Sequence, residues 1–387
     1  MSDTNSWKQE YTQLSNFINE HPEVEVGVSR VRIPENIRPE FYQLFNTVRT
    51  VFIEEKLADL LNEARSLSER YIKVEAEVVT LLELEKISQE THLYSFLHNP
   101  IDELIRGLFN PLFDLLKGKV DIETFGEKAL SNIEVSFRDL YHLGYEKWVA
   151  LSLVKLLQAD KLFQVIPRPF ISEQEETIMS STSPEEDPPA AIESKNFSFQ
   201  RDLAATFTVP DFIVHLSAGN KYTAVRSQIG EALAKASKTS ENREWYPLDS
   251  IGAFISGLTL VYVADNLKDI SLVADADKIC RPDLIIVCKE QQDWYDKEGL
   301  GKIKLDHDRS KPLLGTYVVS RESIPEQAYK DLITEESVAP TLGEERLEQG
   351  DSKQAGIYIL TVGFNQSKLQ PIVSGLMNNR QGLHNES

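Results

Sequence analysis

Acidic and basic side chains lie close together in the sequence VADADKICRPDLIIVCKEQ, which spans residues 273–291. Asp275, Asp277 and Asp283 supply oxygen ligands of the kind that a hard divalent cation such as Mg²⁺ prefers. Lys289 is a further catalytic candidate, and Arg281 is a candidate for binding an anionic group of a substrate. The alternative is a solvated turn between two strands, because Asp and Pro serve turns through local hydrogen bonds and a fixed φ.

A second candidate site begins at Pro210-Asp211. An apolar strand is expected at 212–216, a turn at 217–220 and a second strand at 222–227, which together predict a hairpin. With helices expected before and after it, the order over residues 201–264 is helix, Pro-Asp, strand, turn, strand, helix, strand. This order resembles the core of the PD-(D/E)xK nuclease superfamily.

The resemblance implies that Asp211 helps to bind Mg²⁺ or Mn²⁺, together with an acidic residue and a lysine two positions apart on the next strand. Here that strand carries Arg226, Ser227 and Gln228, so the acid and the lysine are both missing. A catalytically silent relative of this fold therefore fits the sequence better than an active nuclease does. Arg226 is expected to pair with a carboxylate, either Asp211 or Glu231, or to bind an anionic ligand beside Gln228.

The remaining residues that carry chemistry give weaker signals. Cys280 and Cys288 have no third or fourth soft ligand near them in the sequence, so they do not predict a zinc site. Asp139 and His142 have the spacing of a metal-binding helical pair but are interpreted as residues of a helix end. His307 is flanked by two aspartates on an expected loop. A complete glycine-rich phosphate loop is absent from the sequence.

An acidic, proline-containing segment at 172–194 divides two unlike halves of the chain. It has seven acidic residues and no Lys or Arg, and it is too poor in large apolar residues to build a core, so it predicts a solvated linker. The predicted fold is α+β, with an N-terminal helical, bundle-like domain joined by this acidic linker to a C-terminal mixed α/β domain. The expected boundaries are 1–170, 171–195 and 196–380.

Hydrophobic periodicity places the elements that position these residues. In the first half it predicts a helix over 7–18 that ends at His21-Pro22, and then a short strand at 24–28. Helices are predicted from Pro39 onward, with a new helix starting at Asn99-Pro100 and a break at Asn110-Pro111. The last helix of this half is predicted over 145–163. In the second half it predicts strands at 258–264, 270–274, 283–287, 316–320 and 357–362, and helices at 229–237 and 367–377. The run at 258–264 is expected to be a buried central strand.

Composition restricts the partners. With 41 basic and 61 acidic residues the net charge is −20, which disfavours binding of a nucleic acid backbone. The excess carboxylates either form a solvated surface or dock a basic partner. Apolar runs are too short for a membrane helix, and the N-terminal sequence has no secretory pattern, so we expect a cytoplasmic protein with no membrane partner.

Two function classes follow from these observations. The first is an intracellular interaction or assembly protein that lacks a complete catalytic constellation and binds a protein partner or its own copies. The alternative is a degenerate or divergent PD-(D/E)xK-like phosphodiesterase or nuclease that uses Mg²⁺ or Mn²⁺ as its cofactor.

Overall fold

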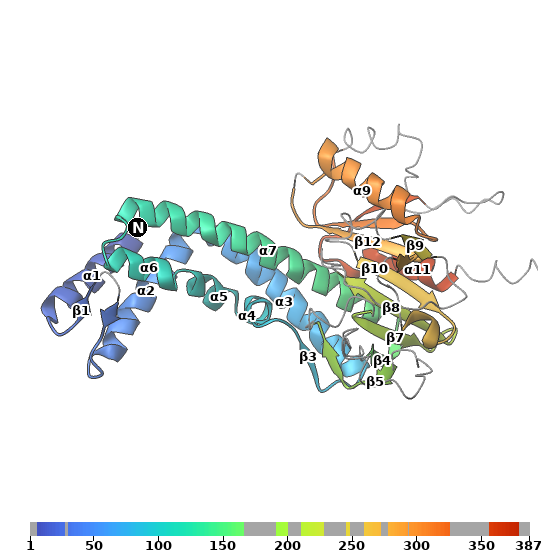
Figure 1. The fold of residues 1–387 in the computed structure, drawn as a ribbon, viewed down its shortest axis with the longest axis horizontal. Helices are drawn as coiled ribbons and strands as arrows, with labels where there is room; N and C mark the ends of the chain where they lie inside the picture. Colours follow the sequence, from blue (N-terminus) through green and yellow to red (C-terminus); the bar gives the residue numbers. More distant parts are fainter. Residues whose placement is uncertain are drawn as a thin grey trace, which may run out of the picture. The chain divides into compact units, whose positions relative to one another are not determined.

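The computed structural model describes residues 6–27, 30–165, 191–199, 210–227, 245–247, 259–271, 278–292, 294–325 and 356–378 (Figure 1). The predicted α+β layout is confirmed, because helices come first and a large sheet follows. The chain forms two compact units. Unit 1 comprises residues 1–73 and 90–145, and unit 2 comprises residues 74–89 and 146–387. These limits differ from the boundaries expected at 170 and 195, since part of the helical half belongs to unit 2.

Unit 1 is helical. Its elements are α1 (Trp7–Glu20), α2 (Arg38–Lys56), the first part of α3 (Ala58–Leu81), α4 (Thr91–His98), α5 (Pro100–Gly107), α6 (Phe109–Leu116), the first part of α7 (Ile122–Leu156) and a two-stranded ladder of β1 (Glu25–Val26) and β2 (Val31–Arg32). Ser6 begins α1 with a capping box to Gln9, and His21 ends it as predicted. Pro100 stands in the first turn of α5, where its missing N–H costs nothing.

Aromatic rings dominate the core of unit 1. The Trp7 ring packs edge-on against Phe52 at 5.2 Å between centroids, and Phe52 packs against Phe125 at 5.6 Å. Gly144 of α7 lies so close to α3 and α4 that a Cβ atom there would meet Leu97 at 2.9 Å and Leu67 at 3.0 Å. A side chain larger than that of glycine at this position would therefore require the Leu97 and Leu67 side chains to move.

The structure corrects two expectations about the last helix. The helix end expected at Asp139 and His142 is wrong, because α7 runs without interruption through Gly144 to Leu156. The helix predicted to continue to residue 163 is also wrong, because Ala159–Val165 forms strand β4. Gln158 turns the chain with a left-handed φ of 51°, and pairing with a distant strand then overrides the local helical pattern.

Unit 2 contains an eight-stranded mixed sheet with the order β14-β13-β12-β10-β8-β7-β4-β5 (Figure 1). Its strands are β4, β5 (Ala191–Glu193), β7 (Phe212–Leu216), β8 (Lys221–Ser227), β10 (Thr259–Ala264), β12 (Leu284–Lys289), β13 (Thr316–Ser320) and β14 (Ile357–Thr361). The last three are parallel, and the other neighbours are antiparallel. The predicted hairpin is β7 and β8, and the predicted strands at 316–320 and 357–362 are confirmed.

Smaller elements complete unit 2. They are β3 (Lys86–Ser88) paired with β6 (Asn196–Ser198), β9 (Trp245–Pro247) paired with β11 (Lys278–Cys280), the 3₁₀ turns η2 (Lys268–Ile270) and η3 (Gln366–Leu369), and the helices α9 (Lys297–Ser310) and α11 (Gln370–Asn378). Helix α11 confirms the predicted closing helix, with Pro371 in its first turn. The strand predicted at 270–274 is wrong at Ile270, which lies in a 3₁₀ turn, and residues 272–274 lie outside the described residues.

Both faces of the sheet are covered by apolar side chains. On one face, Leu260 and Ile285 belong to a buried cluster that includes Ile303 of α9. On the other face, Val261 and Ile286 face the last turns of α7. All six residues of β10 are buried, and β10 lies between β12 and β8, which confirms the predicted central strand.

The residues on either side of 166–190 lie at one edge of the sheet. Val165 of β4 and Ala191 of β5 are register partners, so the residues that flank 166–190 face each other within unit 2. Residues 171–190 lie outside the described residues, and Ala191–Glu193 form β5. The helices predicted at 201–207 and 229–237 also lie outside them. In the described chain, no helix is long and apolar enough to cross a membrane.

Candidate functional site

Asp211 and Arg226 form a buried ion pair at the open end of the β7–β8 hairpin. Arg226 Nη1 lies 3.4 Å from Asp211 Oδ1, and the two side chains are only 2% and 6% exposed. The backbone N–H of Asp211 donates to the carbonyl of Val225 at 2.8 Å, which continues the hairpin ladder by one residue. The expectation that Arg226 pairs with a carboxylate is confirmed, and the partner is Asp211.

This pair changes what Asp211 can do chemically. A guanidinium group carries only hydrogen-bond donors and a permanent positive charge, so Arg226 cannot ligate a cation. It places its charge next to the carboxylate that the nuclease resemblance would assign to a divalent ion. Gln228, the other candidate on this strand, lies outside the described residues.

Asp283 lies at the start of β12 and serves the backbone. Its Oδ2 accepts the N–H of Val263 at 2.7 Å, its own N–H donates to Val261, and its carbonyl accepts the N–H of Leu314. The residue is 4% exposed. These bonds fix the entry of β12 into the sheet, which is a structural use of the carboxylate.

Lys289 lies at the far end of the same strand. Six residues of extended chain span about 20 Å, so Lys289 and Asp283 do not converge. Burial lowers the pKa of the Lys289 ammonium group, and Glu290 opposes that shift. Its register partner is Ser320, whose hydroxyl accepts the indole N–H of Trp294 at 2.9 Å.

Of the other members of the predicted cluster, the structure describes Arg281. Asp275 and Asp277 lie outside the described residues. Arg281 Nε donates to the carbonyl of Lys311 at 2.5 Å, and Lys311 is the C-cap residue of α9. Arg281 thus satisfies a carbonyl at a helix C-terminus, where a positive charge is favourable.

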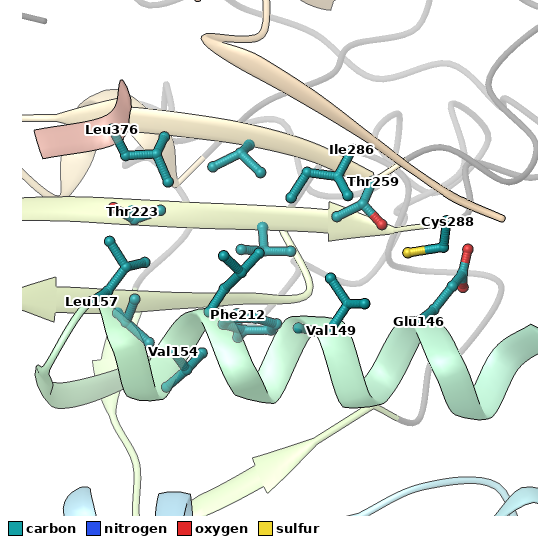
Figure 2. A pocket seen from close by; sticks show the side chains of 15 residues that line it. Glu146, Val149, Val154, Leu157, Phe212, Thr223, Thr259, Ile286, Cys288 and Leu376 are labelled. Carbon is teal, nitrogen blue, oxygen red and sulfur yellow. The ribbon is translucent and has the colours of Figure 1, made fainter. Parts of the chain in front are cut away.

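A small cavity separates α7 from the sheet in unit 2 (Figure 2). Figure 2 shows Glu146 and Cys288 at one end and Thr223 and Leu376 at the other. Its volume is about 20 Å³, enough for one water molecule and far below the several hundred Å³ of a ligand pocket. Burial, and then the charge of Glu146, raises the pKa of the Cys288 thiol, which disfavours a reactive thiolate.

Two further expectations are corrected. Asp139 and His142 lie within α7 and not at a helix end. His307 lies in α9 and not on a loop, and its Nδ1 is 2.9 Å from the hydroxyl of Thr316. Among the residues that the structure describes, no group of three or more His, Cys, Asp or Glu side chains is arranged to hold a metal ion.

The sequence analysis missed one polar cluster. His215, Asp160, Ser217 and Asn220 are joined by hydrogen bonds where β4 meets the β7–β8 turn. Asp160 lies 55 positions before His215, and only the pairing of β4 with β7 brings them together. In the sequence, the turn predicted at 217–220 was the single local indication of this cluster.

Comparison with known proteins finds no matching family model, no similar curated protein and no similar solved structure.

Proposed function

We propose that this protein is a non-enzymatic interaction or assembly protein whose helical and α/β units contact different partners or different copies of the chain. The observation that carries the proposal is the buried ion pair of Asp211 and Arg226. It uses the only described aspartate that the nuclease resemblance assigns to metal binding.

The chemistry of the pair supports this conclusion. Hydrolysis of a phosphodiester needs a cation to neutralise charge and to activate water. Asp211 is instead neutralised by Arg226, which has no lone pair to offer a cation. Removing Arg226 from the pair would take away the positive charge beside a buried carboxylate, so we expect its loss to be strongly destabilising.

The proposed partner is a protein. A net charge of −20 works against association with another polyanion and favours a partner with a basic surface. We place the protein in the cytoplasm, with another protein or a second copy of the chain as its partner.

A cleavage assay tests the absence of catalysis. The full chain is incubated with DNA and RNA in Mg²⁺ and in Mn²⁺, and wild type is compared with Asp211→Ala. We expect no cleavage by either protein. Metal-dependent cleavage that Asp211→Ala abolishes would overturn the proposal and support the nuclease alternative.

Melting with and without the same metals gives an independent readout, because a ligand that binds only the native state raises the melting temperature. Wild type is expected to show no change. Arg226→Glu is the matched control, since it places a second carboxylate beside Asp211 and is expected to be stabilised by Mn²⁺.

Assembly is tested directly by mass photometry across a concentration series, followed by cross-linking and mass spectrometry of the full chain. Self-association is expected to give larger species at higher concentration and cross-links between copies. A strict monomer at every concentration would remove self-association and leave a different protein as the proposed partner.

A further inference from the structure

In the described chain, the eight-stranded sheet ends in β5 on one side and in β14 on the other, and these two edge strands differ. Strand β5 has three residues, and so short an edge gives another strand little to pair with. Strand β14 has five residues and lies in the run IYILTV at 357–362, which has no charge, proline or glycine. A run of this kind favours pairing with another copy of itself, so β14 is the edge that needs protection.

The backbone bonds between β14 and β13 show which groups of β14 face outward. The N–H of Thr316 donates to the carbonyl of Gly356, and the N–H of Val362 donates to the carbonyl of Ser320. Successive residues of a strand direct their backbone groups to opposite sides, so the even-numbered residues of β14 bond to β13. The residues whose N–H and carbonyl groups face the outer edge are Ile357, Ile359 and Thr361. Among the described residues, β14 pairs with β13 alone.

A lysine side chain occupies one end of this outer edge. The exposed Lys368 donates from Nζ to the carbonyl of Thr361 at 2.9 Å. We propose that Lys368 protects the outer edge of β14 against pairing with β14 of a second copy of the chain. An ammonium group carries donors alone, so it satisfies the carbonyl that an arriving strand needs, and an arriving strand would have to displace it or bury its charge.

The turn after β14 brings Lys368 back to the strand. Gly363 has a left-handed φ of 57°, which a glycine adopts without strain. Asn365 then begins the 3₁₀ turn η3, because its side-chain oxygen accepts the N–H of Ser367 at 3.1 Å and its carbonyl accepts the N–H of Lys368 at 3.1 Å. Residues 357–367 include no charged residue, so Lys368 is the first charge after the apolar run.

The pairing that Lys368 opposes is symmetric. Two antiparallel β14 strands related by a two-fold axis at Ile359 would exchange both backbone bonds at that residue. At each end, the carbonyl of Thr361 would accept the N–H of Ile357 of the second copy. Lys368 occupies this carbonyl, so the symmetric pairing loses one hydrogen bond at each of its two ends.

Analytical ultracentrifugation of the full chain over a concentration series tests the protection. Lys368→Met keeps the stem and removes the donor, and it is expected to lower the dimer Kd at least about 10-fold relative to wild type, because two hydrogen bonds of about 1 kcal/mol each become available. Lys368→Arg keeps a charged donor and should behave as wild type. Lys268→Met removes the same charge from the exposed turn η2 and should also behave as wild type.

A dimer Kd of Lys368→Met equal to that of wild type would overturn the proposal. An equal change in Lys268→Met would overturn it too, because the cause would then be the net charge of the chain. The comparison is made between variants, so it holds whether or not the wild-type chain associates through another surface, which is the question that the proposed function raises.

A second variant locates the contact. Thr361→Pro removes an outward N–H, and proline is tolerated on an edge strand. Combined with Lys368→Met, it is expected to return the dimer Kd to the wild-type value. Association that persists in a folded double variant would place the contact elsewhere and overturn the proposal.

Amide hydrogen exchange measured by nuclear magnetic resonance reports on the edge itself. In wild type, the outward N–H of Ile359 is expected to exchange faster than the N–H groups of Tyr358 and Leu360, which bond to β13. In concentrated Lys368→Met, the exchange at Ile359 should become slow. Slow exchange at Ile359 already in dilute wild type would show that this edge is covered without Lys368, and would overturn the proposal.

Discussion

Among the described residues, each unit buries one arginine, and the two units satisfy its charge differently. In unit 1, Arg49 is 9% exposed and lies over the rings of Phe45 and Phe109, at 5.0 and 5.4 Å, while Nη1 donates to the carbonyl of Ile105 at 3.1 Å. In unit 2, Arg226 is 1% exposed and pairs with a buried carboxylate. Arg49 leaves neutral groups behind if it is removed, whereas Arg226 leaves a charge.

The folding free energy lost when a buried cation is removed therefore depends on the group with which the cation is paired. Aromatic faces and a helix-end carbonyl attract a cation but tolerate its loss. An ionised carboxylate in a buried site does not tolerate the loss of its cation, because the cation is the group in the pair that neutralises its charge. The predictions below order the expected losses of folding free energy from this difference.

The largest loss is expected when unit 2 receives a charge with no partner. Val261→Asp places a carboxylate in β10, on the face packed against α7, and should cost more than about 4 kcal/mol or prevent folding. Soluble expression and thermal melting measure this. Val261→Ala, which changes only volume, is the control, and a normally melting Val261→Asp protein would contradict the buried position of this strand.

Arg226→Met should cost about 3–5 kcal/mol, because Asp211 then loses the positive charge beside it in a buried site. Urea denaturation of the full chain measures the loss. The double variant Asp211→Asn with Arg226→Met removes both charges and should recover most of it. If the double variant is as unstable as the single one, packing of the arginine stem and not the ion pair sets the cost.

Arg49→Met should cost about 1–2 kcal/mol, less than the change at Arg226, because a charged hydrogen bond and two ring contacts are lost but no charge is stranded. The same urea experiment measures it. A loss equal to that of Arg226→Met would show that the two units do not differ in the way described.

The smallest effect is expected at the surface. Lys161 and Glu193 form an ion pair at 3.2 Å with both side chains 49% exposed, so Lys161→Met should change stability by less than about 0.5 kcal/mol. The small difference should vanish in 1 M salt. A large, salt-independent loss would indicate that the lysine stem packs against the β4–β5 edge.

The sequence predicted those elements whose signal is local. The β7–β8 hairpin follows from apolar strands around a polar turn, and β10 follows from an unbroken apolar run. Strand β4 was missed because residues 159–163 continue the apolar spacing of α7, and only pairing with β7 makes them extended. Local pattern cannot show a partner that lies more than 50 positions away.

The candidate site shows the same division. The sequence shows an arginine at position 226, where the nuclease resemblance requires an acidic residue. This difference led to the correct expectation of an ion pair. The role of Asp283 is not visible in the sequence, because its carboxylate accepts the backbone N–H of Val263. Nearly every residue type has a backbone N–H, so the sequence does not mark this partner. Asp283 and Lys289 are close in the sequence, yet an extended strand carries Lys289 away from Asp283. Asp275 and Asp277 lie outside the described residues, so a cluster of the three aspartates stays a prediction.

The pairing of Val165 with Ala191 bears on how the chain tolerates rearrangement. Antiparallel partners lie about 5 Å apart, a gap that a two-residue hairpin turn closes. The pairing of β4 with β5 therefore does not need a connection as long as residues 166–190. Shortening this stretch to a tight turn, or placing new chain termini within it, is expected to leave the eight-stranded sheet intact.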